Sequence, residues 1–253
     1  MSGTVYLVGA GPGAPDLLTL RAARLLARAD VVFHDALIAT DTLALATRAE
    51  KIAVGKRCGR HSTAQRFINK RLADAAAKYD IVVRLKGGDP MLFARAQEEI
   101  AALEAANIPY EVVPGVTAAL AAAAQIGTSL TQRGSVRSFA FATPRVGTGE
   151  EPSNWIDGFR GANAGAIYMG LRQAPAIADA LIGAGRAPST PVAVVIDAST
   201  PDAQTHYTTL AALPAFADRD VGRPALLLVG PQFRARAMSS VRDVDPGAIA
   251  QAR

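Results

Sequence analysis

The stretch Thr4-Val-Tyr-Leu-Val-Gly-Ala-Gly-Pro-Gly13 decides the fold class of this chain of 253 residues. Its first five residues, Thr4 to Val8, are apolar or β-branched and run directly into a glycine-rich turn, which predicts a buried strand and its end. Longer Ala- and Leu-rich helical stretches separate it from the next strand candidates, Val31 to Phe33 and Ile81 to Leu85. This alternation is typical of parallel βαβ units, so we expect an α/β protein.

The same alternation continues along the chain and is interrupted once, near residues 134–138. In the first part, further strands are expected at Lys51 to Val54 and Tyr110 to Val113, and helices at Leu20 to Arg28, Thr63 to Lys78 and Ala96 to Ala106. In the second part, strands are expected at Phe139 to Thr143, Gly165 to Met169, Pro191 to Ile196, Thr205 to Thr209 and Ala225 to Val229. We therefore expect a first domain of residues 1–136, a second of 137–240 and a flexible tail of 241–253.

Composition excludes several classes of protein. Half of the residues are hydrophobic and 19% are charged, which excludes global disorder. No window approaches 18 uninterrupted apolar residues and the first residues lack a signal-peptide pattern, so we expect a cytoplasmic protein without a membrane partner. The net charge of +5 comes without blocks of like charge, so no nucleic-acid partner is expected. The only cysteine, Cys58, and three scattered histidines have no metal-ligand spacing, so we expect no metal.

Three turns rich in glycine or proline each follow directly on an expected strand. They are Gly9-Ala-Gly-Pro-Gly13, Gly87-Gly-Asp-Pro90 and Pro114-Gly-Val-Thr117. Ligands of open parallel sheets bind beyond the carboxyl ends of the strands. Glycine lets the backbone turn sharply and approach a ligand, whose oxygens its free N–H groups can bind. The sequence therefore predicts one ligand site shared by the three turns.

The first turn admits a second interpretation. Gly9 to Ala14 matches the G-x-G-x-x-A pattern of dinucleotide-binding proteins, with Asp35 as the acid that binds ribose. That pattern opens directly into a helix whose N-terminus binds pyrophosphate. Here Pro12 and Pro15 interrupt the segment, and Thr19 is a better helix N-cap. A ligand without pyrophosphate is therefore favoured, and a nicotinamide-dependent oxidoreductase remains the alternative from another class.

Several segments, in their order and spacing, together resemble the uroporphyrinogen-III C-methyltransferases of the tetrapyrrole methylase family. The resemblance covers residues 4–232 and depends on the first turn and on VGKRCGRHS (54–62), VVRLKGGDP (82–90), IPYEVVPGVTAALAAAAQIG (108–127), LTQRG (130–134) and YMGL (168–171). It implies a two-domain fold with a mostly parallel N-terminal sheet, a mixed C-terminal sheet and the active site in the cleft between them. It also implies a homodimer that methylates uroporphyrinogen III to precorrin-2, via precorrin-1, for sirohaem, cobalamin or haem d1.

The methyl donor implied by the resemblance is S-adenosylmethionine, which leaves as S-adenosylhomocysteine. By motif, the resemblance assigns its contacts to Pro12, Gly87, Gly88, Asp89, Leu92, Thr117, Ala118, Met169 and Ala198. The residue types agree, since Asp89 offers a carboxylate for the ribose or the amino group. Leu92 and Met169 offer apolar walls for adenine, although Met169 read alone would more often be a core residue.

The resemblance also assigns the reacting groups and the substrate contacts. Asp35 and Lys56 match the acid/base positions of the family, whereas read alone they would be a helix cap and a solvated lysine. The carbons of uroporphyrinogen are electron-rich, so methyl transfer needs alignment, and loss of the proton afterwards needs a base such as Asp35. The eight carboxylates of the substrate need cations, for which we expect Arg95 and Arg133, with Arg57 and Arg60 as further candidates. Glu98 is expected to bind a pyrrole N–H or to orient Arg95.

The chain departs from the usual family pattern beside the expected substrate. It has Phe93-Ala-Arg-Ala-Gln97 where the family usually has Phe-Gly-Arg-Gly-Gly, which should stiffen that loop. It also has Thr143-Pro-Arg145 for Thr-Gly-His, and Thr128-Ser-Leu-Thr131 for Ile-Pro-Leu-Thr. The donor turns are intact. A methyltransferase acting on a later precorrin, or on another acceptor of the superfamily, therefore remains an alternative.

Overall fold

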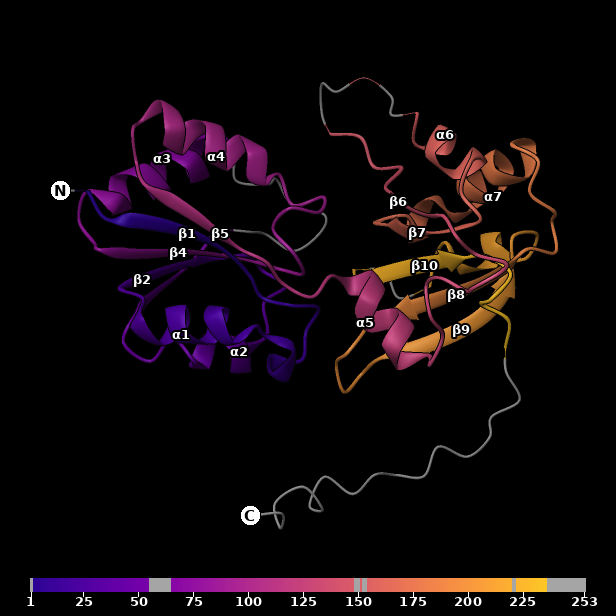
Figure 1. The fold of residues 1–253 in the computed structure, drawn as a ribbon, viewed down its shortest axis with the longest axis horizontal. Helices are drawn as coiled ribbons and strands as arrows, with labels where there is room; N and C mark the ends of the chain where they lie inside the picture. Colours follow the sequence, from indigo (N-terminus) through magenta and orange to yellow (C-terminus); the bar gives the residue numbers. More distant parts are fainter. Residues whose placement is uncertain (1, 55–64, 148–150, 152–153, 220–221, 236–253) are drawn as a thin grey trace, which may run out of the picture.

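The computed structural model describes residues 2–54, 65–147, 151, 154–219 and 222–235, and these form two α/β units side by side (Figure 1). Each unit contains a sheet of five strands. Lys56, Arg57, Arg60 and the expected tail of 241–253 lie outside the described residues.

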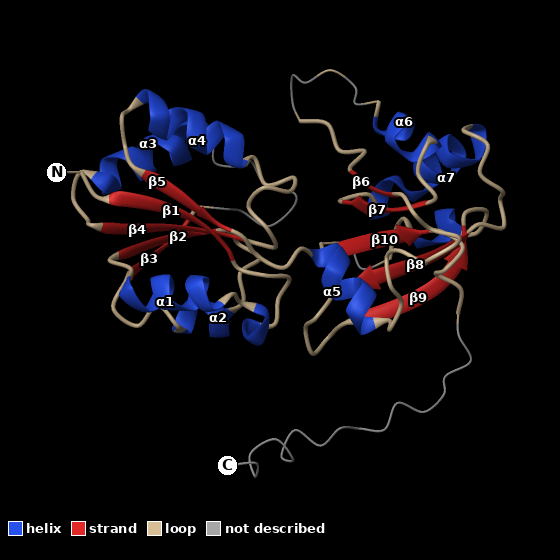
Figure 2. Cartoon of the chain, viewed as in Figure 1, coloured by secondary structure: helices blue, strands red, loops and turns tan. Residues whose placement is uncertain are grey.

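The first sheet is wholly parallel, as expected. Its strands are arranged in the order β3 (Glu50–Ala53), β2 (Val31–His34), β4 (Ile81–Lys86), β1 (Thr4–Gly9) and β5 (Tyr110–Val113). One face is covered by α1 (Leu20–Arg28) and α2 (Thr40–Ala44), and the other by α3 (Gln65–Ala76) and α4 (Ala96–Ala105) (Figure 2). Because all five strands run the same way, their carboxyl ends lie along the same edge.

The second sheet is mixed. Its strands are arranged in the order β6 (Phe139–Ala142), β7 (Ala164–Tyr168), β10 (Ala225–Val229), β8 (Pro191–Ile196) and β9 (Gln204–Thr209). Only β6 and β7 pair in parallel. One face packs against α6 (Trp155–Arg160), α7 (Ala174–Gly183) and the short helices η2 (Leu171–Gln173) and η3 (Leu213–Phe216). The parallel first sheet and mixed second sheet confirm the expected fold class.

The other face of the second sheet is covered by α5 (Ala118–Gln125), which belongs to this sheet by packing. The buried side chains Ala119 and Ala122 share a core cluster with Ala164, Ala166 and Leu228. Alanines on both sides let the helix lie close to the strands. The domain boundary at residue 136 remains a prediction. The packing of α5 on the second sheet favours a passage of the chain from the first unit to the second between β5 and α5.

The start of α1 agrees with the sequence analysis. The prolines are followed by a short helix η1 (Pro15–Leu17), and α1 begins only at Leu20. The Ala22 N–H donates to Thr19 Oγ1 at 3.1 Å, so Thr19 is the N-cap. The first glycine turn is therefore separated from α1, as expected for a site that does not bind pyrophosphate at a helix end.

Candidate functional site

Backbone contacts bring the three glycine turns together at the carboxyl edge of the first sheet. Gly11 N–H donates to the Gly88 carbonyl at 3.2 Å, and Gly88 N–H donates to the Gly11 carbonyl at 2.7 Å. A Cβ on Gly115 would lie 2.3 Å from the Gly88 oxygen, and one on Gly9 would lie 2.6 Å from Gly115 Cα. The turns therefore approach each other more closely than side chains would allow, which is why glycine occupies these positions.

Asp89 ties two of these turns to each other. Its Oδ2 accepts from Gly115 N–H at 2.9 Å and its Oδ1 accepts from Met91 N–H at 2.8 Å. Beside it, Gly87 is exposed and a Cβ there would meet no atom within 4 Å. Open backbone at Gly87 fits a bound small molecule such as the expected donor. A direct contact between Asp89 and the donor stays a prediction.

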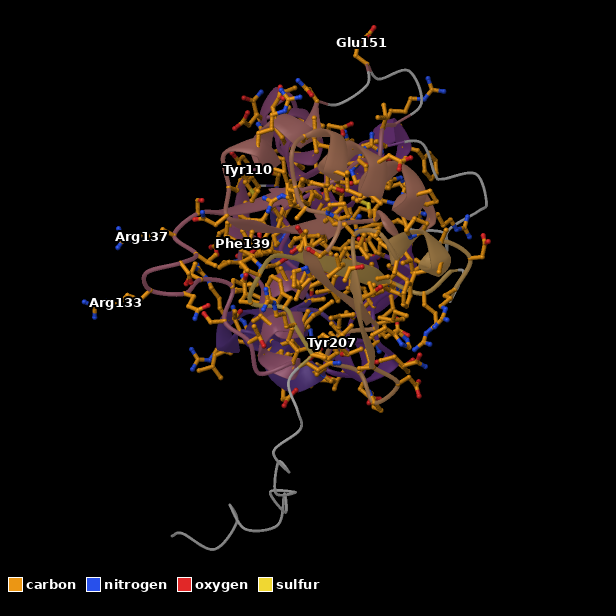
Figure 3. All side chains as sticks on the ribbon, turned by 90° about the vertical axis from the view of Figure 1, so that its right-hand side faces the viewer. Tyr110, Arg133, Arg137, Phe139, Glu151 and Tyr207 are labelled. Atoms are coloured by element: carbon orange, nitrogen blue, oxygen red, sulfur yellow. The ribbon has the colours of Figure 1, made fainter. Side chains whose placement is uncertain are left out.

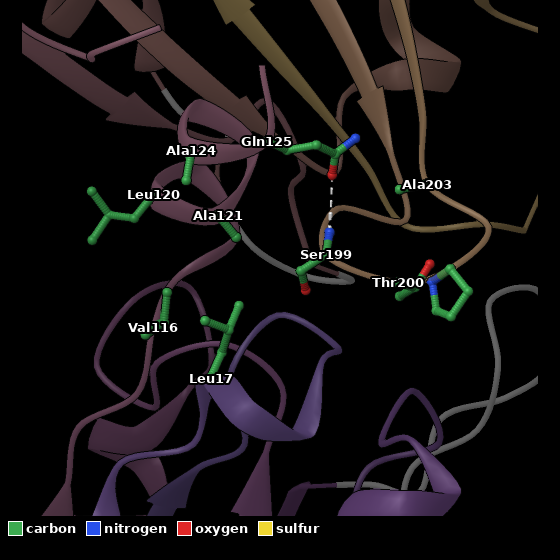
Figure 4. A pocket seen from close by; sticks show the side chains of 10 residues that line it. Leu17, Val116, Leu120, Ala121, Ala124, Gln125, Ser199, Thr200 and Ala203 are labelled. Carbon is green, nitrogen blue, oxygen red and sulfur yellow. Dashed lines mark hydrogen bonds between the residues drawn. The ribbon is translucent and has the colours of Figure 1, made fainter. Parts of the chain in front are cut away.

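Loops of the second domain close over the first turn. Ala14 N–H donates to Ser199 Oγ at 3.2 Å, and a Cβ on Gly13 would lie 2.7 Å from Thr200 Cγ2. Ser199 N–H donates to Gln125 Oε1 of α5 at 3.0 Å, the dashed line in Figure 4. An open cavity of about 530 Å³ lies beside these contacts, between Leu17, α5 and residues 199–203 (Figure 4). Ala198, an expected donor contact, is 8% exposed in the same core cluster as α5.

Tyr168, at the end of β7, joins the second sheet to the start of α5. Its hydroxyl lies 2.7 Å from Thr117 Oγ1 and accepts from Ala119 N–H at 3.1 Å. Burial raises the pKa of the Tyr168 hydroxyl, which therefore stays protonated and can donate to Thr117. The ring of Phe93, from the loop after β4, lies 5.2 Å from the Tyr168 ring, centroid to centroid. Two expected donor contacts, Thr117 and Ala118, thus lie at a junction of the two domains.

Met169 follows Tyr168 and is not part of the core. It is 42% exposed and has a φ of 55°. The Arg145 guanidinium lies 3.8 Å from its sulfur atom. Arg145 is one of the residues at which the chain departs from the family pattern, so this departure lies beside an expected donor contact.

Asp35 lies at the edge of a buried network of charges. Its Oδ1 is 2.5 Å from Arg84 Nη2, and Arg84 Nε donates to Glu99 Oε1 at 3.0 Å. Lys86 Nζ is 2.9 Å from both Glu99 oxygens, and Gln65 donates to Glu99 at 3.1 Å. Arg84, Lys86 and Glu99 are at most 3% exposed, whereas the side chain of Asp35 is 33% exposed. Asp35 is therefore the member of the network that a substrate can reach.

Sequence reasoning assigned no role to Arg84, Lys86 or Glu99. The available signal was local, because two cations interrupt the otherwise apolar strand β4, and buried charged residues are rare unless they are paired. Burial and the nearby Arg84 charge lower the pKa of Lys86, while Glu99 opposes this effect.

The expected substrate residues fall in two places. Arg95 and Glu98 form a two-point ion pair of 2.6 and 2.8 Å, and the hydrogen bond from Arg95 lowers the pKa of Glu98. Glu98 thus contacts Arg95, and the role of either residue toward a substrate stays a prediction. Arg133 instead lies in an exposed turn bounded by the bridge between Gln132 and Val136, and projects outward (Figure 3).

The altered loop after β4 accommodates its extra side chains. The left-handed conformations fall at Phe93 (φ 54°) and Arg95 (φ 57°), not at the positions where the family usually has glycine. Ala96 and Gln97 are the first residues of α4, where side chains are favoured over glycine. The three replacements are therefore compatible with the backbone of this loop.

Comparison with known proteins agrees with this geometry. The family model "Tetrapyrrole (Corrin/Porphyrin) Methylases" matches residues 4–214. The chain belongs to the tetrapyrrole methylase family. It is thus a methyltransferase of a family whose donor is S-adenosylmethionine. Among described residues, no group of three His, Cys, Asp or Glu side chains could bind a metal, and no helix is long and apolar enough to cross a membrane.

Its relatives within the family include a siroheme synthase of Azotobacter vinelandii, 47% identical over 92% of this chain and 51% of that protein. A siroheme synthase of Pseudomonas fluorescens is 45% identical over 93% of this chain. The chain spans about half the length of the curated relatives it matches. Among solved structures, uroporphyrin-III C-methyl transferase of Thermus thermophilus, complexed with S-adenyl homocysteine, is 40% identical with a TM-score of 0.79, covering 90% of this chain and 97% of that one. A cobalt precorrin-4 methyltransferase is 27% identical with a TM-score of 0.79, covering 92% of this chain and 96% of that one.

Proposed function

We propose that this methylase transfers methyl groups from S-adenosylmethionine to carbon atoms of uroporphyrinogen III, giving precorrin-2 via precorrin-1. The observation that carries the proposal is that the three glycine turns and Asp35 share one edge of the first sheet. Asp35 N–H donates to the carbonyl of Leu85 at 3.3 Å, two residues before Gly87. A proton acceptor therefore lies near the backbone that fits the donor.

The donor would be bound by the turns and by residues from both domains. Its site would comprise Pro12, Gly87, Gly88, Asp89, Leu92, Thr117, Ala118, Met169 and Ala198. The exposed backbone at Gly87 suits its polar groups, and Leu92 and Met169 suit its adenine. Its sulfonium centre supplies an electrophilic methyl group.

The residues of the chain would align the ring carbon and then remove its proton. As the new C–C bond forms, the S–CH₃ bond breaks and its electron pair stays on sulfur. The methylated ring carries a positive charge, which is lost when Asp35 accepts a proton. Lys56 completes the proposed acid/base pair.

Arg95, Glu98 and Arg133 would bind the substrate. The fork of Arg95 suits a carboxylate, and Glu98 already holds it in one orientation. A pyrrole N–H could bind Glu98 once a substrate carboxylate takes its place on Arg95.

A later precorrin is the second candidate substrate. The likeness to a cobalt precorrin-4 methyltransferase favours it, but that enzyme is only 27% identical while the Thermus enzyme is 40% identical. The nicotinamide alternative has no such support, because the first turn leads into η1 and α1 starts only at Leu20.

We further propose a homodimer that acts in the cytoplasm. Leu120 on α5 is 53% exposed and Phe141 on β6 is 42% exposed, and both line one apolar depression beside α5. Sedimentation of the Leu120→Glu variant tests the dimer: a monomer is expected, and an unchanged sedimentation coefficient would place the contact elsewhere.

The decisive experiment is an anaerobic assay with uroporphyrinogen III and S-adenosylmethionine, followed by mass analysis. Products heavier by one and then two methyl groups are expected. Calorimetric titration should detect binding of S-adenosylhomocysteine but not of NAD. Tight NAD binding without a response to S-adenosylhomocysteine would refute the proposal. Methylation of a later precorrin but not of uroporphyrinogen III would favour the second candidate substrate.

A further inference from the structure

We infer that Arg84 positions the carboxylate of Asp35, and that Glu99 and Lys86 hold Arg84 in place for this purpose. The inference rests on the proposed function in one respect, since Asp35 is the proposed proton acceptor there. Arg84 itself is 3% exposed, so it acts through Asp35 and does not contact the substrate.

The guanidinium of Arg84 is fixed in three directions. Nη2 contacts Asp35 Oδ1 at 2.5 Å, Nε donates to Glu99 Oε1 at 3.0 Å and Nη1 donates to the carbonyl of Leu85 at 3.1 Å. A planar group bound at three of its nitrogens cannot rotate without breaking a contact. The position of Asp35 Oδ1 is therefore set by strand β4 and helix α4, not by its own loop alone.

The need to neutralise Glu99 does not by itself explain why Arg84 is buried beside it. Lys86 already contacts both Glu99 oxygens at 2.9 Å. A second buried cation would leave an excess positive charge, which is costly away from water. Asp35 is the second anion in contact with Arg84, so the network contains two positive and two negative side chains. Arg84 therefore needs Asp35 for its charge, and Asp35 gains a fixed orientation.

A second Arg–Asp pair of the same sheet offers a matched control. Arg48 lies 2.5 Å from Asp30, just before the amino end of β2, whereas Asp35 follows its carboxyl end. The side chain of Arg48 is 62% exposed, and the second oxygen of Asp30 accepts from Ile81 N–H. Arg48 thus forms a similar pair away from the donor turns.

A double-mutant cycle on turnover tests the inference. Arg84→Lys keeps the charge but cannot reproduce the fork, so we expect kcat to fall roughly 10- to 100-fold through misplacement of Asp35. KM for uroporphyrinogen III and affinity for S-adenosylhomocysteine should barely change. If Arg84 acts through Asp35, the Asp35→Asn/Arg84→Lys variant should be within about twofold of Asp35→Asn alone. Arg48→Lys should turn over like the unmodified chain.

The inference would be overturned if the loss of kcat in the double variant equals the product of the two single losses. An Arg84→Lys variant with unchanged kcat would overturn it as well. If Arg84→Lys does not fold, Glu99→Gln, which keeps the side-chain shape, takes its place in the cycle. A chain that methylates only a later precorrin refutes the proposed substrate, and the cycle is then run with that acceptor. Independently of any activity, a crystal structure of Arg84→Lys or Glu99→Gln is expected to show the Asp35 carboxylate displaced. An unmoved carboxylate would overturn the inference.

Discussion

The two sheets of this methylase differ in what they bury. Among the described residues, the buried charged side chains are Arg84, Lys86 and Glu99, and all three belong to the first domain. The second sheet buries apolar side chains on both faces, with small alanines beneath α5. The first sheet therefore carries side chains suited to chemistry, and the second provides an apolar support that positions α5.

This difference predicts that substitutions around the first sheet lower turnover, while substitutions around the second lower the stability of the fold. Tyr168 and Ser199 are where this separation is weakest, because they join the second domain to the donor turns. Variants in each region therefore test how far the two roles are separate.

The largest effect is expected at Asp35. Asp35→Asn keeps the shape of the side chain but removes the proton acceptor, so kcat should fall about 10²- to 10⁴-fold. Affinity for S-adenosylhomocysteine, measured by calorimetry, should stay nearly unchanged. Full turnover in this variant would reduce Asp35 to a structural residue and leave the first sheet without its proposed chemistry.

The next effect is expected where the glycine turns meet. Gly115→Ala would place a Cβ 2.3 Å from the Gly88 oxygen, forcing the turns apart at a cost of about 1–3 kcal/mol. Affinity for S-adenosylhomocysteine should fall about tenfold or more. Gly183→Ala at the end of α7 is the matched control, since its Cβ meets nothing within 4 Å. Equal donor affinity in both variants would show that the convergence of the turns is not needed for binding.

A smaller effect is expected at the substrate arginines. Arg95→Ala should raise the apparent KM for uroporphyrinogen III roughly tenfold, because a charge-assisted bond to a carboxylate is lost. Arg95→Lys should rescue it only partly. Arg133→Ala is expected to act likewise, although Arg133 lies in an exposed turn between α5 and β6. Steady-state kinetics at varied uroporphyrinogen III concentration give the KM of each variant, and an unchanged KM for Arg133→Ala would leave Arg95 as the arginine that binds the substrate.

The smallest effect is expected at Tyr168. Tyr168→Phe keeps the ring beside Phe93 but removes the bonds to Thr117 and Ala119, costing about 1 kcal/mol of stability. The midpoint of thermal unfolding, Tm, should therefore fall by about 2–4 °C. The kcat should change by less than about twofold. A large loss of turnover would show that the second sheet takes part in catalysis after all.

Local sequence patterns were sufficient to predict the strands of both sheets and the start of α1. The strands Pro191–Ile196 and Ala225–Val229 have the bounds that their apolar runs predicted, and Thr19 caps α1 as its position suggested. The glycine turns were also found, because each follows a strand and parallel strands end at a common edge. These features depend on residues close in sequence.

The remaining features depend on partners far apart in the chain. Arg84 and Glu99 are 15 residues apart, and Arg84 and Asp35 are 49 apart. Nothing in a single strand shows which distant carboxylate will neutralise its arginine. Helix α5 was not predicted, and its alanine-rich sequence does not show on which of the two sheets it packs.

The position of α5 sets where segments can be exchanged between relatives of this family. A hybrid joined at residue 136 would set α5 of one parent against strands β7 and β10 of the other, across a surface where alanines allow close approach. A hybrid joined near Pro114, between β5 and α5, would keep that helix with its own strands. The contacts still to be matched would be those of Gly115 with Gly9, Gly88 and Asp89, those of Gly13 and Ala14 with Thr200 and Ser199, and the approach of Phe93 to Tyr168. Recombination should therefore succeed more often at the earlier junction.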